Sequence, residues 1–391
     1  MPRDFISLVA GFSVIPKRLF SVVCGYVFFL SLRHRRHSLR CAARLVGCDE
    51  SRFSALLSRF DIVALVRELF VAVLRRLLEQ SSTGERPVFI IDTTFQQRQS
   101  QSLENVHRYF TGTRFVTAHK FINIVLLTAQ GPIPVDCIAV YTKKYCRKYA
   151  IPYHSEYELA ALWIESLAQS ALFSAEFLRR SIFLLDAGFD TRRIQRTIRV
   201  LGAHFVVALK SLRVISGKNV AEYFRRHRHL AWHTIRLESG SGRKKHRRKY
   251  SVRTATNVEL RGVGPATVVW SKAHGHAKKP KYLAASDASM STREIIQYYA
   301  RRWDIELWHR DMKQNYGYGD CHCRKFAAVE AHVTLSLTAY ALRRLCAHPA
   351  PTLDDHLRRQ DLLRLRPETS RYGGAKRLKN LIDAGLRQLA A

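Results

Sequence analysis

Residues 299–313 read YARRWDIELWHRDMK, and in a helix they place Tyr299, Arg302, Glu306 and Lys313 on one face. The last three residues follow the tyrosine by three, seven and fourteen positions, which at about 100° per residue spans a wedge roughly 60° wide. The face therefore carries a carboxylate, two cations and a phenol. A carboxylate can hold a hard metal ion and nearby cations can hold phosphates, so the pattern indicates phosphodiester chemistry. The alternative is a solvated helix face with ordinary charge pairs.

Two further acids follow apolar runs earlier in the chain. Asp92 ends the run VFII, and Asp186 ends SIFLL just before the turn Ala-Gly. We expect two buried strands whose carboxyl ends meet at one edge of a sheet, with the helix of Glu306 closing over that edge. The three carboxylates could then hold two Mg²⁺ ions, with Mn²⁺ as a substitute, about 3.5–4 Å apart. Each acid alone could instead be a strand-end cap or a turn former.

The two expected ions have different roles in such a site. One ion would activate water or a 3′-hydroxyl, and the other would stabilise the leaving oxygen of an in-line displacement. Asp92, Asp186 and Glu306 are therefore the predicted metal ligands and catalytic residues.

The charge of the chain indicates a polyanionic partner. The 391 residues contain 65 Lys and Arg against 31 Asp and Glu, a net charge of +34, and these cations are spread along the whole chain. Such an excess repels itself unless a polyanion is near, and nucleic acid is the partner it fits best. Because 47% of the residues are hydrophobic, the composition excludes a disordered protein. The length of 391 residues is enough for two or three domains.

The cysteines and the most apolar run both indicate a protein outside the membrane. Eight cysteines occur without a CxxC pair, a pattern typical of reduced thiols in the cytoplasm. The ligands of Cys321-His322-Cys323 are too close in sequence to form a standard zinc site. The run from Leu19 to Leu32 is 14 residues long, shorter than a membrane span, so we expect a buried core helix.

Hydrophobic periodicity predicts an α/β protein with a mixed sheet. Strands are expected at 88–92, 115–128, 133–141, 181–186 and 204–209, with helices at 155–172, 191–201, 292–315 and 329–345. Between them, short alternating runs at 233–237, 250–254, 266–270 and 281–284 predict a β-rich insertion. The predicted domains are an N-terminal α-helical domain (1–80), a catalytic core in two parts (85–210 and 289–345), the insertion (211–288) and a basic tail (346–391).

Two segments outside the core are predicted to contact DNA. The segment 39–58 has the form of a helix-turn-helix, with the small Ala43 at the helix contact and Gly47 at the turn. Any two packed helices can look like this, so DNA binding there is a hypothesis. The insertion also contains a basic run whose alternative is a solvated loop, and its candidate DNA contacts are Arg243, Lys244, Lys245, Arg247 and Arg248.

These motifs together resemble the DDE transposases of bacterial insertion sequences, in the subgroup with the signature Tyr-x2-Arg-x3-Glu-x6-Lys. The spacing from Tyr299 to Lys313 matches without a gap, and Trp303 follows the arginine as in the family. The runs IIDTT at Asp92 and LLDAGF at Asp186 resemble the first and second aspartate motifs. The chain has Ala187 where the family often has arginine, which removes no ligand.

The resemblance implies an RNase H-like core with a β-rich insertion before the last catalytic helix. It also implies an enzyme that cuts an element at its terminal inverted repeats and joins it to target DNA, with Tyr299, Arg302 and Lys313 gripping phosphates. In relatives, excision passes through a hairpin with a base flipped onto an aromatic of the insertion. Tyr282, or alternatively Trp270, stands about where that aromatic lies; an ordinary strand residue is the other interpretation of Tyr282.

The resemblance further implies a homodimer that brings two element ends together, in the bacterial cytoplasm at the nucleoid. Two alternatives remain at this point. One is an RNase H-like nuclease that hydrolyses DNA and never joins it. The other is a catalytically silent DNA-binding protein derived from a transposase, against which the three intact acids argue.

Overall fold

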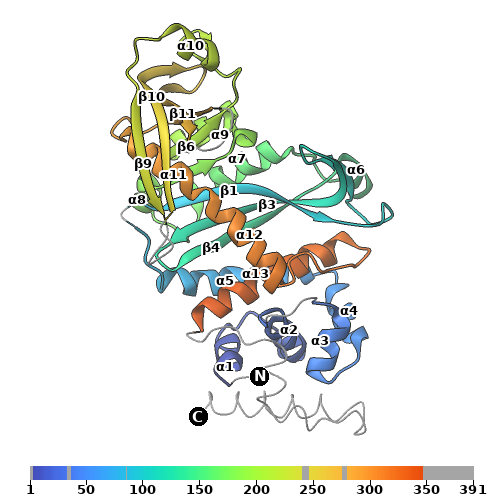
Figure 1. Ribbon diagram of the computed structural model, residues 1–391. Coiled ribbons are helices and arrows are strands. Elements are labelled where there is room, and N and C mark those ends of the chain that lie inside the picture. The colour runs from blue at the N-terminus through green and yellow to red at the C-terminus, as the bar shows by residue number, and fades with distance from the viewer. Residues whose placement is uncertain (1–2, 33–36, 85, 240–245, 275–279, 347–391) are drawn as a thin grey trace.

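The computed structural model describes residues 3–32, 37–84, 86–239, 246–274 and 280–346. Figure 1 shows a group of N-terminal helices below a long twisted sheet, with further helices on both faces of the sheet. The molecule is therefore a mixed α/β structure, as predicted. The predicted basic tail lies outside the described residues apart from Cys346.

The N-terminal helices begin and end where local sequence directs them. The Ser38 side chain caps the start of α3 by accepting a hydrogen bond from the N–H of Cys41, and Gly47 ends the same helix with a φ of +69°. Asp49 caps the start of α4. The predicted two-helix segment is thus present in its local structure. The helices are α1 Arg3–Ala10, α2 Lys17–Leu30, α3 Leu39–Val46, α4 Glu50–Leu57 and α5 Ile62–Glu79.

The predicted apolar run lies largely in α2, which is buried against the other helices. Its Tyr26, Phe28 and Phe29 side chains are among the largest fully buried groups. Within the described part of the chain, no helix combines the length and apolarity needed to cross a membrane.

The core sheet places three parallel strands beside antiparallel ones. The strand order in the core is β4-β3-β1-β5-β6. Strands β1, β5 and β6 run parallel to one another, whereas β3 is antiparallel to both β1 and β4. The short strand β2 pairs in antiparallel with the beginning of β3. The strands are β1 Val88–Gln97, β2 His107–Phe110, β3 Phe115–Thr128, β4 Gly131–Val140, β5 Ile182–Leu185 and β6 His204–Leu209. The short strand β2 was not predicted.

Asp92 lies within a strand and not at its end, which corrects the prediction. Strand β1 continues through Gln97 because Thr93 and the residues after it keep pairing with β3. The pairing with β5, however, stops at Ile91 opposite Leu185, one residue before each acid. Asp92 and Asp186 therefore each lie one residue beyond the last pair of β1 and β5. This places both acids at the same edge of the parallel strands.

Helices cover both faces of the core sheet. Phe89 of β1 packs on one face against Trp163 of α7 and Phe177 of α8, while α12 and α13 cover the opposite face (Figure 1). The predicted helix at 155–172 ends as α-helix at Ser166, and the short helices α6 and α8 were not predicted. The helices are α6 Lys143–Tyr149, α7 Glu156–Ser166, α8 Ala175–Arg180, α9 Arg192–Val200 and α13 Phe326–Leu345.

The β-rich insertion joins the core sheet instead of standing apart from it. Strand β12 pairs with β6, so that the described residues form one sheet of twelve strands. Strand β10 is much longer than predicted, because a bulge at Asn257, with a φ of +49°, lets pairing with β11 continue. The elements are β7 Val214–Ile215, β8 Lys218–Asn219, α10 Val220–Arg226, β9 His233–Ser239, β10 His246–Leu260, β11 Gly264–Ala273 and β12 Lys281–Ala285.

The helix predicted at 292–315 is divided at Arg302. Helix α11 spans Thr292–Arg301 and α12 spans Trp303–Asn315. At the division, the N–H of Arg302 bonds to the carbonyl of Tyr299 and the N–H of Ile305 bonds to that of Arg302, both three residues back. This tighter turn keeps helical backbone angles at Arg302 and turns α12 relative to α11.

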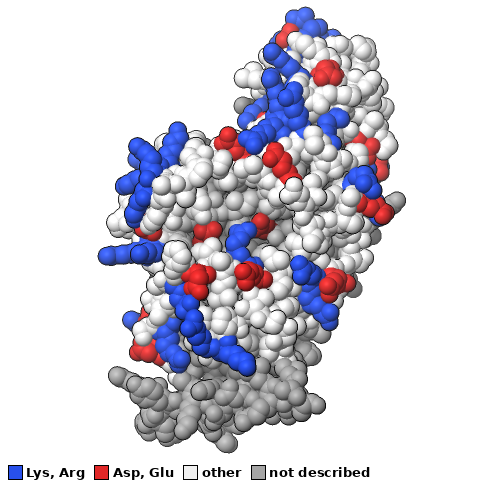
Figure 2. Space-filling view, turned by 180° about the vertical axis from the view of Figure 1, so that it is seen from behind, with Lys and Arg blue, Asp and Glu red and all other residues white. Residues whose placement is uncertain are grey.

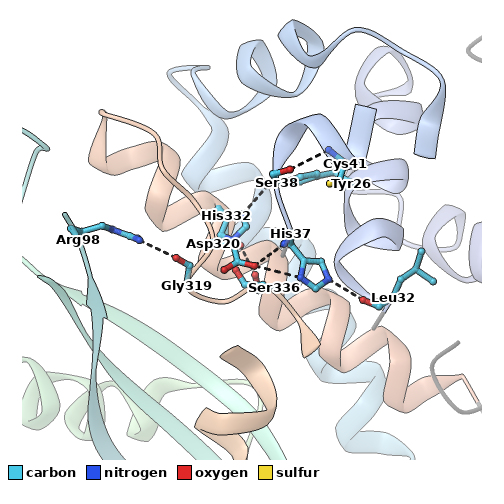
Figure 3. A network of polar contacts seen from close by, with 11 residues as sticks. Tyr26, Leu32, His37, Ser38, Cys41, Arg98, Gly319, Asp320, His332 and Ser336 are labelled. Atoms are coloured by element: carbon cyan, nitrogen blue, oxygen red, sulfur yellow. Dashed lines mark hydrogen bonds and ion pairs between the residues drawn. The ribbon is translucent and has the colours of Figure 1, made fainter. Parts of the chain in front are cut away.

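A polar junction fastens the N-terminal helices to the loop between α12 and α13 (Figure 3). The Tyr26 hydroxyl donates to Nδ1 of His332 at 2.8 Å, and Nε2 of His332 contacts the Gly317 carbonyl at 2.7 Å. Burial lowers the pKa of His332 to about 4, so its ring is neutral and can both donate and accept. The N–H of His37 donates to Asp320 at 2.7 Å. The loop that follows α12 is thereby held from the N-terminal side.

We predict that Gly317→Ala destabilises this junction strongly. Gly317 has a φ of +64°, and a Cβ there would lie 2.5 Å from the Cβ of His37, so strain and a steric clash combine. We expect a loss of about 2 kcal/mol or more in the free energy of unfolding, measured by denaturant titration. Gly319→Ala is the matched control, since its Cβ would meet no atom within 4 Å. Equal losses in the two variants would contradict the assigned role of Gly317.

Candidate active site

Arg302 joins two of the three predicted acids. Its Nη2 donates to Oε1 of Glu306 at 2.5 Å, and its Nη1 lies 3.6 Å from Oδ2 of Asp92. The side chains of Arg302 and Asp92 are only 14% and 15% exposed, so this contact between α12 and β1 is largely shielded from water. The predicted helix face therefore points at the predicted strand acid.

Asp186 occupies the end of the neighbouring strand. It follows β5 directly and caps the 3₁₀ turn Ala187–Phe189, where its Oδ1 accepts a hydrogen bond from the N–H of Phe189 at 3.1 Å. This is the turn-capping role considered from the sequence. Asp186 is also close enough for its charge to act on Asp92.

The surroundings of Asp92 hold its proton more tightly than those of a free carboxyl group when no other cation is present. Burial raises the pKa of Asp92 to about 7, and the negative charges of Asp186 and Glu306 add to the shift. The positive charge of Arg302 opposes these effects without cancelling them. The positive charge of Arg302 therefore does not fully compensate the acids, which leaves an edge where a further cation would be stabilised.

Lys313 is anchored two helical turns beyond Glu306. Its Nζ donates to the hydroxyl of Thr94 at 2.7 Å and to the carbonyl of Phe95 at 3.3 Å, both in β1 just after Asp92. Arg302, before Glu306 in the chain, and Lys313, after it, thus both contact strand β1. This places the two signature cations along the strand that carries the first acid.

A buried polar network that the sequence did not reveal holds α12 against the sheet. Asn123 of β3 stands directly opposite Asp92, donates to Nε2 of His309 at 3.0 Å, and accepts from the Tyr318 hydroxyl at 2.9 Å. Burial, reinforced by the charges of Lys313 and Arg302, lowers the pKa of His309 to about 3, so the ring is a neutral acceptor. The one available signal was an asparagine within the otherwise apolar run 121–127.

A groove separates helices α11 and α12 from the strands of the insertion. Tyr299, Arg302 and Trp303 line it from the helices, and Arg248 and Tyr250 line it from β10. The small cavity by Tyr299 has a volume of about 170 Å³, and an adjoining cavity by Trp303 has about 920 Å³. The groove thus gathers signature residues with an insertion arginine and an aromatic, Tyr250, that sequence reasoning missed.

With this geometry established, comparison with known proteins decides the family. The family model of the transposase DDE domain matches residues 83–342, more than half of the chain. The chain belongs to this transposase family. A search of curated proteins found no match. The transposase domain so defined contains Asp92, Asp186 and Glu306 and extends nearly to the end of α13.

The acids of the transposase domain suit a hard divalent cation by their chemistry. They offer only oxygen donors, which Mg²⁺ and Mn²⁺ prefer. Among the residues that the structure describes, no three His, Cys, Asp or Glu side chains form a ready-made ligand cluster. Instead, the guanidinium of Arg302 lies against Asp92 and Glu306 and supplies positive charge there. The donor set thus fits a metal, provided that Arg302 moves aside.

Tyr282 does not face the edge of the transposase domain that carries the three acids. Its neighbour Lys281 faces that edge, with Nζ 5.2 Å from the ring of Tyr299, so Tyr282 points to the opposite face of β12. There it stands beside Trp270 and packs 6.0 Å from the ring of Phe224 in α10. Both aromatics suggested by the resemblance therefore lie on the face of the sheet that is turned away from the acids.

The basic run of the insertion is described only in part. Arg243, Lys244 and Lys245 lie outside the described residues. Arg247 is exposed and pairs with Glu238 at 2.9 Å, whereas Arg248 lines the groove. Within the described half of this run, only Arg248 is thus placed beside the signature residues.

Proposed function

We propose that this transposase cuts an insertion element at its terminal inverted repeats and joins it to target DNA, using Mg²⁺ or Mn²⁺ held by Asp92, Asp186 and Glu306. One observation carries the proposal: Arg302 bridges Asp92 and Glu306 while Asp186 ends the adjacent parallel strand. This arrangement supports placing the three carboxylates, which come from three separate elements, along one sheet edge. The strand order β4-β3-β1-β5-β6 is the basis for proposing that the core is RNase H-like.

The charged residues would have two roles, holding metal ions and binding phosphates. Two bound ions would activate a water or a 3′-hydroxyl and stabilise the leaving oxygen. Arg302, once displaced from the carboxylates, can bind a phosphate through two parallel hydrogen bonds, and Lys313 can bind a neighbouring phosphate as a point charge. Tyr299, half-buried beside Lys281, would help to position the DNA strand between the phosphates bound by Arg302 and Lys313. These four signature positions support membership in the bacterial subgroup named above.

If excision passes through a hairpin, the groove indicates which aromatic would hold a flipped base. Tyr250 of β10 lines the same cavities as Trp303, whereas Tyr282 faces away. Stacking on an aromatic offsets the cost of unpairing a base. We therefore propose Tyr250, and not Tyr282, as the candidate for that role.

The proposed partner is double-stranded DNA, bound by a homodimer that holds two element ends. Helices α3 and α4 support a role in recognising the end, since Arg52 is exposed on α4. The proposed location is the bacterial nucleoid.

The net charge of +34 predicts a steep salt dependence of DNA binding. A protein that contacts many phosphates releases the same number of counterions, so the association constant should fall on the order of 10³-fold between about 50 and 200 mM salt. Fluorescence anisotropy with a duplex of the element end measures this directly. A flat response would mean that the charge serves something other than DNA.

The joining step is tested with DNA that is already cut. We expect the protein to insert a duplex ending in a 3′-hydroxyl at the element terminus into a supercoiled plasmid when Mg²⁺ is present. A matched duplex with a 3′-deoxy end is the control, since it lacks the attacking oxygen. Hydrolysis of DNA without any joined product would favour the nuclease alternative and overturn the joining half of the proposal.

A further inference from the structure

A further cavity, separate from the two cavities of the groove, has none of the three acids in its lining. Its volume is about 570 Å³, within the range of about 300–1,000 Å³ typical of small-ligand sites. It is formed by the strands β2, β3 and β4 together with the starts of α6 and α7. The side chains that give it its chemistry are Tyr109, Tyr141, Tyr153, Tyr157, Lys120, Lys143, Lys144, Arg147 and Glu156.

The cavity combines aromatic rings with an excess of cations. Its carboxylate, Glu156, is paired with Lys120, so the exposed Lys143, Lys144 and Arg147 set the charge of its rim. Tyr153 is 45% exposed, and Nζ of Lys143 lies 5.3 Å from its ring. Exposed rings beside unneutralised cations are the two features that bind a base and its phosphate together.

Two contacts connect this cavity with the active-site edge. The ring of Tyr157 lies 6.1 Å from that of Phe189, whose N–H bonds to Asp186. The ring of Tyr109 lies 5.1 Å from that of Phe95, whose carbonyl accepts from Lys313. The walls of the cavity are therefore one residue away from a predicted metal ligand and from a signature cation.

We propose that this cavity binds an unpaired nucleotide of the DNA strand that is handled at the acids. The base stacks on Tyr153, and Lys143, Lys144 and Arg147 bind its phosphates. A base inside a duplex exposes only its edges, so the accessible ring selects a nucleotide that has left the stack. This inference rests on the proposed function, because that function brings the strand to this edge.

The charge distribution on this side of the molecule agrees with the proposal. Figure 2 shows Lys and Arg side chains gathered over the region of α6, at the left of this view, and again over the insertion at the top. Acidic and basic side chains are mixed over the face between them. The cations beside the cavity therefore belong to a basic region that is separate from the one over the insertion.

The test measures stacking directly, with a single-stranded oligonucleotide of about 12 nucleotides that contains one 2-aminopurine. Binding is followed by anisotropy and by the loss of 2-aminopurine fluorescence on stacking, without metal and at about 0.2 M salt to weaken general phosphate binding. We expect Tyr153→Ala to weaken single-strand binding about tenfold and to abolish the fluorescence loss, while duplex binding changes less than about twofold. Tyr153→Phe keeps the ring and should behave as the wild type.

Phe115→Ala is the matched control. Phe115 is also an exposed ring, at 57%, with Arg108 stacked 4.9 Å from its centre, but it does not line the cavity. Unchanged single-strand binding by Tyr153→Ala, an equal loss in Phe115→Ala, or an equal loss on duplex DNA would each overturn the proposal. The binding assay needs neither metal nor cleavage. A negative result in it would therefore not contradict the proposed cleavage chemistry, and a wild type that is inactive in a cleavage assay would not change the binding result.

Discussion

Glu306→Gln is expected to reduce DNA cleavage by at least about 10³-fold while leaving DNA binding within about twofold of the wild type. The change replaces a proposed metal ligand by a neutral amide of the same size. It also removes the negative charge that Arg302 contacts at 2.5 Å, which weakens the attraction that holds the guanidinium there. Initial cleavage rates of a labelled end duplex in Mg²⁺, beside anisotropy in the same buffer without metal, measure the two effects separately.

Asp304→Asn is the control for this variant. Asp304 lies two positions away on α12, and its carboxylate contacts Arg301, not the acids. The substitution removes the same charge from the same helix, so it should retain cleavage within a few-fold of the wild type. If Asp304→Asn were as inactive as Glu306→Gln, the loss would reflect a general change in α12, and the assignment of Glu306 as a ligand would fail.

Asp92→Asn is expected to abolish cleavage and at the same time to stabilise the metal-free protein. The pKa of Asp92 is raised from 3.8 to about 7, so the folded protein holds this proton more tightly than the unfolded chain does. Ionising Asp92 therefore destabilises the fold: the cost is absent below about pH 4, grows between pH 4 and 7, and is complete above pH 7. Asparagine carries no such cost and should add on the order of 2–4 kcal/mol above pH 7.

Denaturant titrations with a chelator at pH 4.5 and pH 8 measure this gain. The stability difference between Asp92→Asn and the wild type should be small at the lower pH and large at the higher one. Glu79→Gln on α5, an exposed carboxylate paired with Arg76, provides a control whose effect should stay small at both values. A gain that does not depend on pH would show that desolvation of Asp92 is not its cause.

The helix face was predictable because it depends on a short local pattern. Tyr299, Arg302, Glu306 and Lys313 need only the turn of a helix to share a side, and the division at Arg302 keeps helical backbone angles. Asp92 was harder, since the end of an apolar run is not the end of a strand when β-branched residues follow. What places Asp92 correctly is the end of its pairing with β5, and a single sequence does not show pairing.

The residues missed were those whose role depends on long-range pairing. Asn123 meets His309 and Tyr318 from positions far apart in the chain, so no local pattern connects them. The direction of Tyr282 depends on strand register, because a shift of one residue reverses the face to which a side chain points. Register also brings Tyr250 into the groove. The sequence therefore predicted that the acids share one sheet edge better than it predicted the surroundings that orient them.

The most direct test of the central claim is excision from a donor plasmid that carries the gene with its native flanks. Wild type and Glu306→Gln are compared side by side with Mg²⁺, and DNA binding by both is measured in parallel. The account predicts excision and rejoining by the wild type alone, with both proteins bound to the element ends. Equal excision by Glu306→Gln, or none by a wild type that binds the ends tightly, would contradict the proposal that these three acids cut DNA.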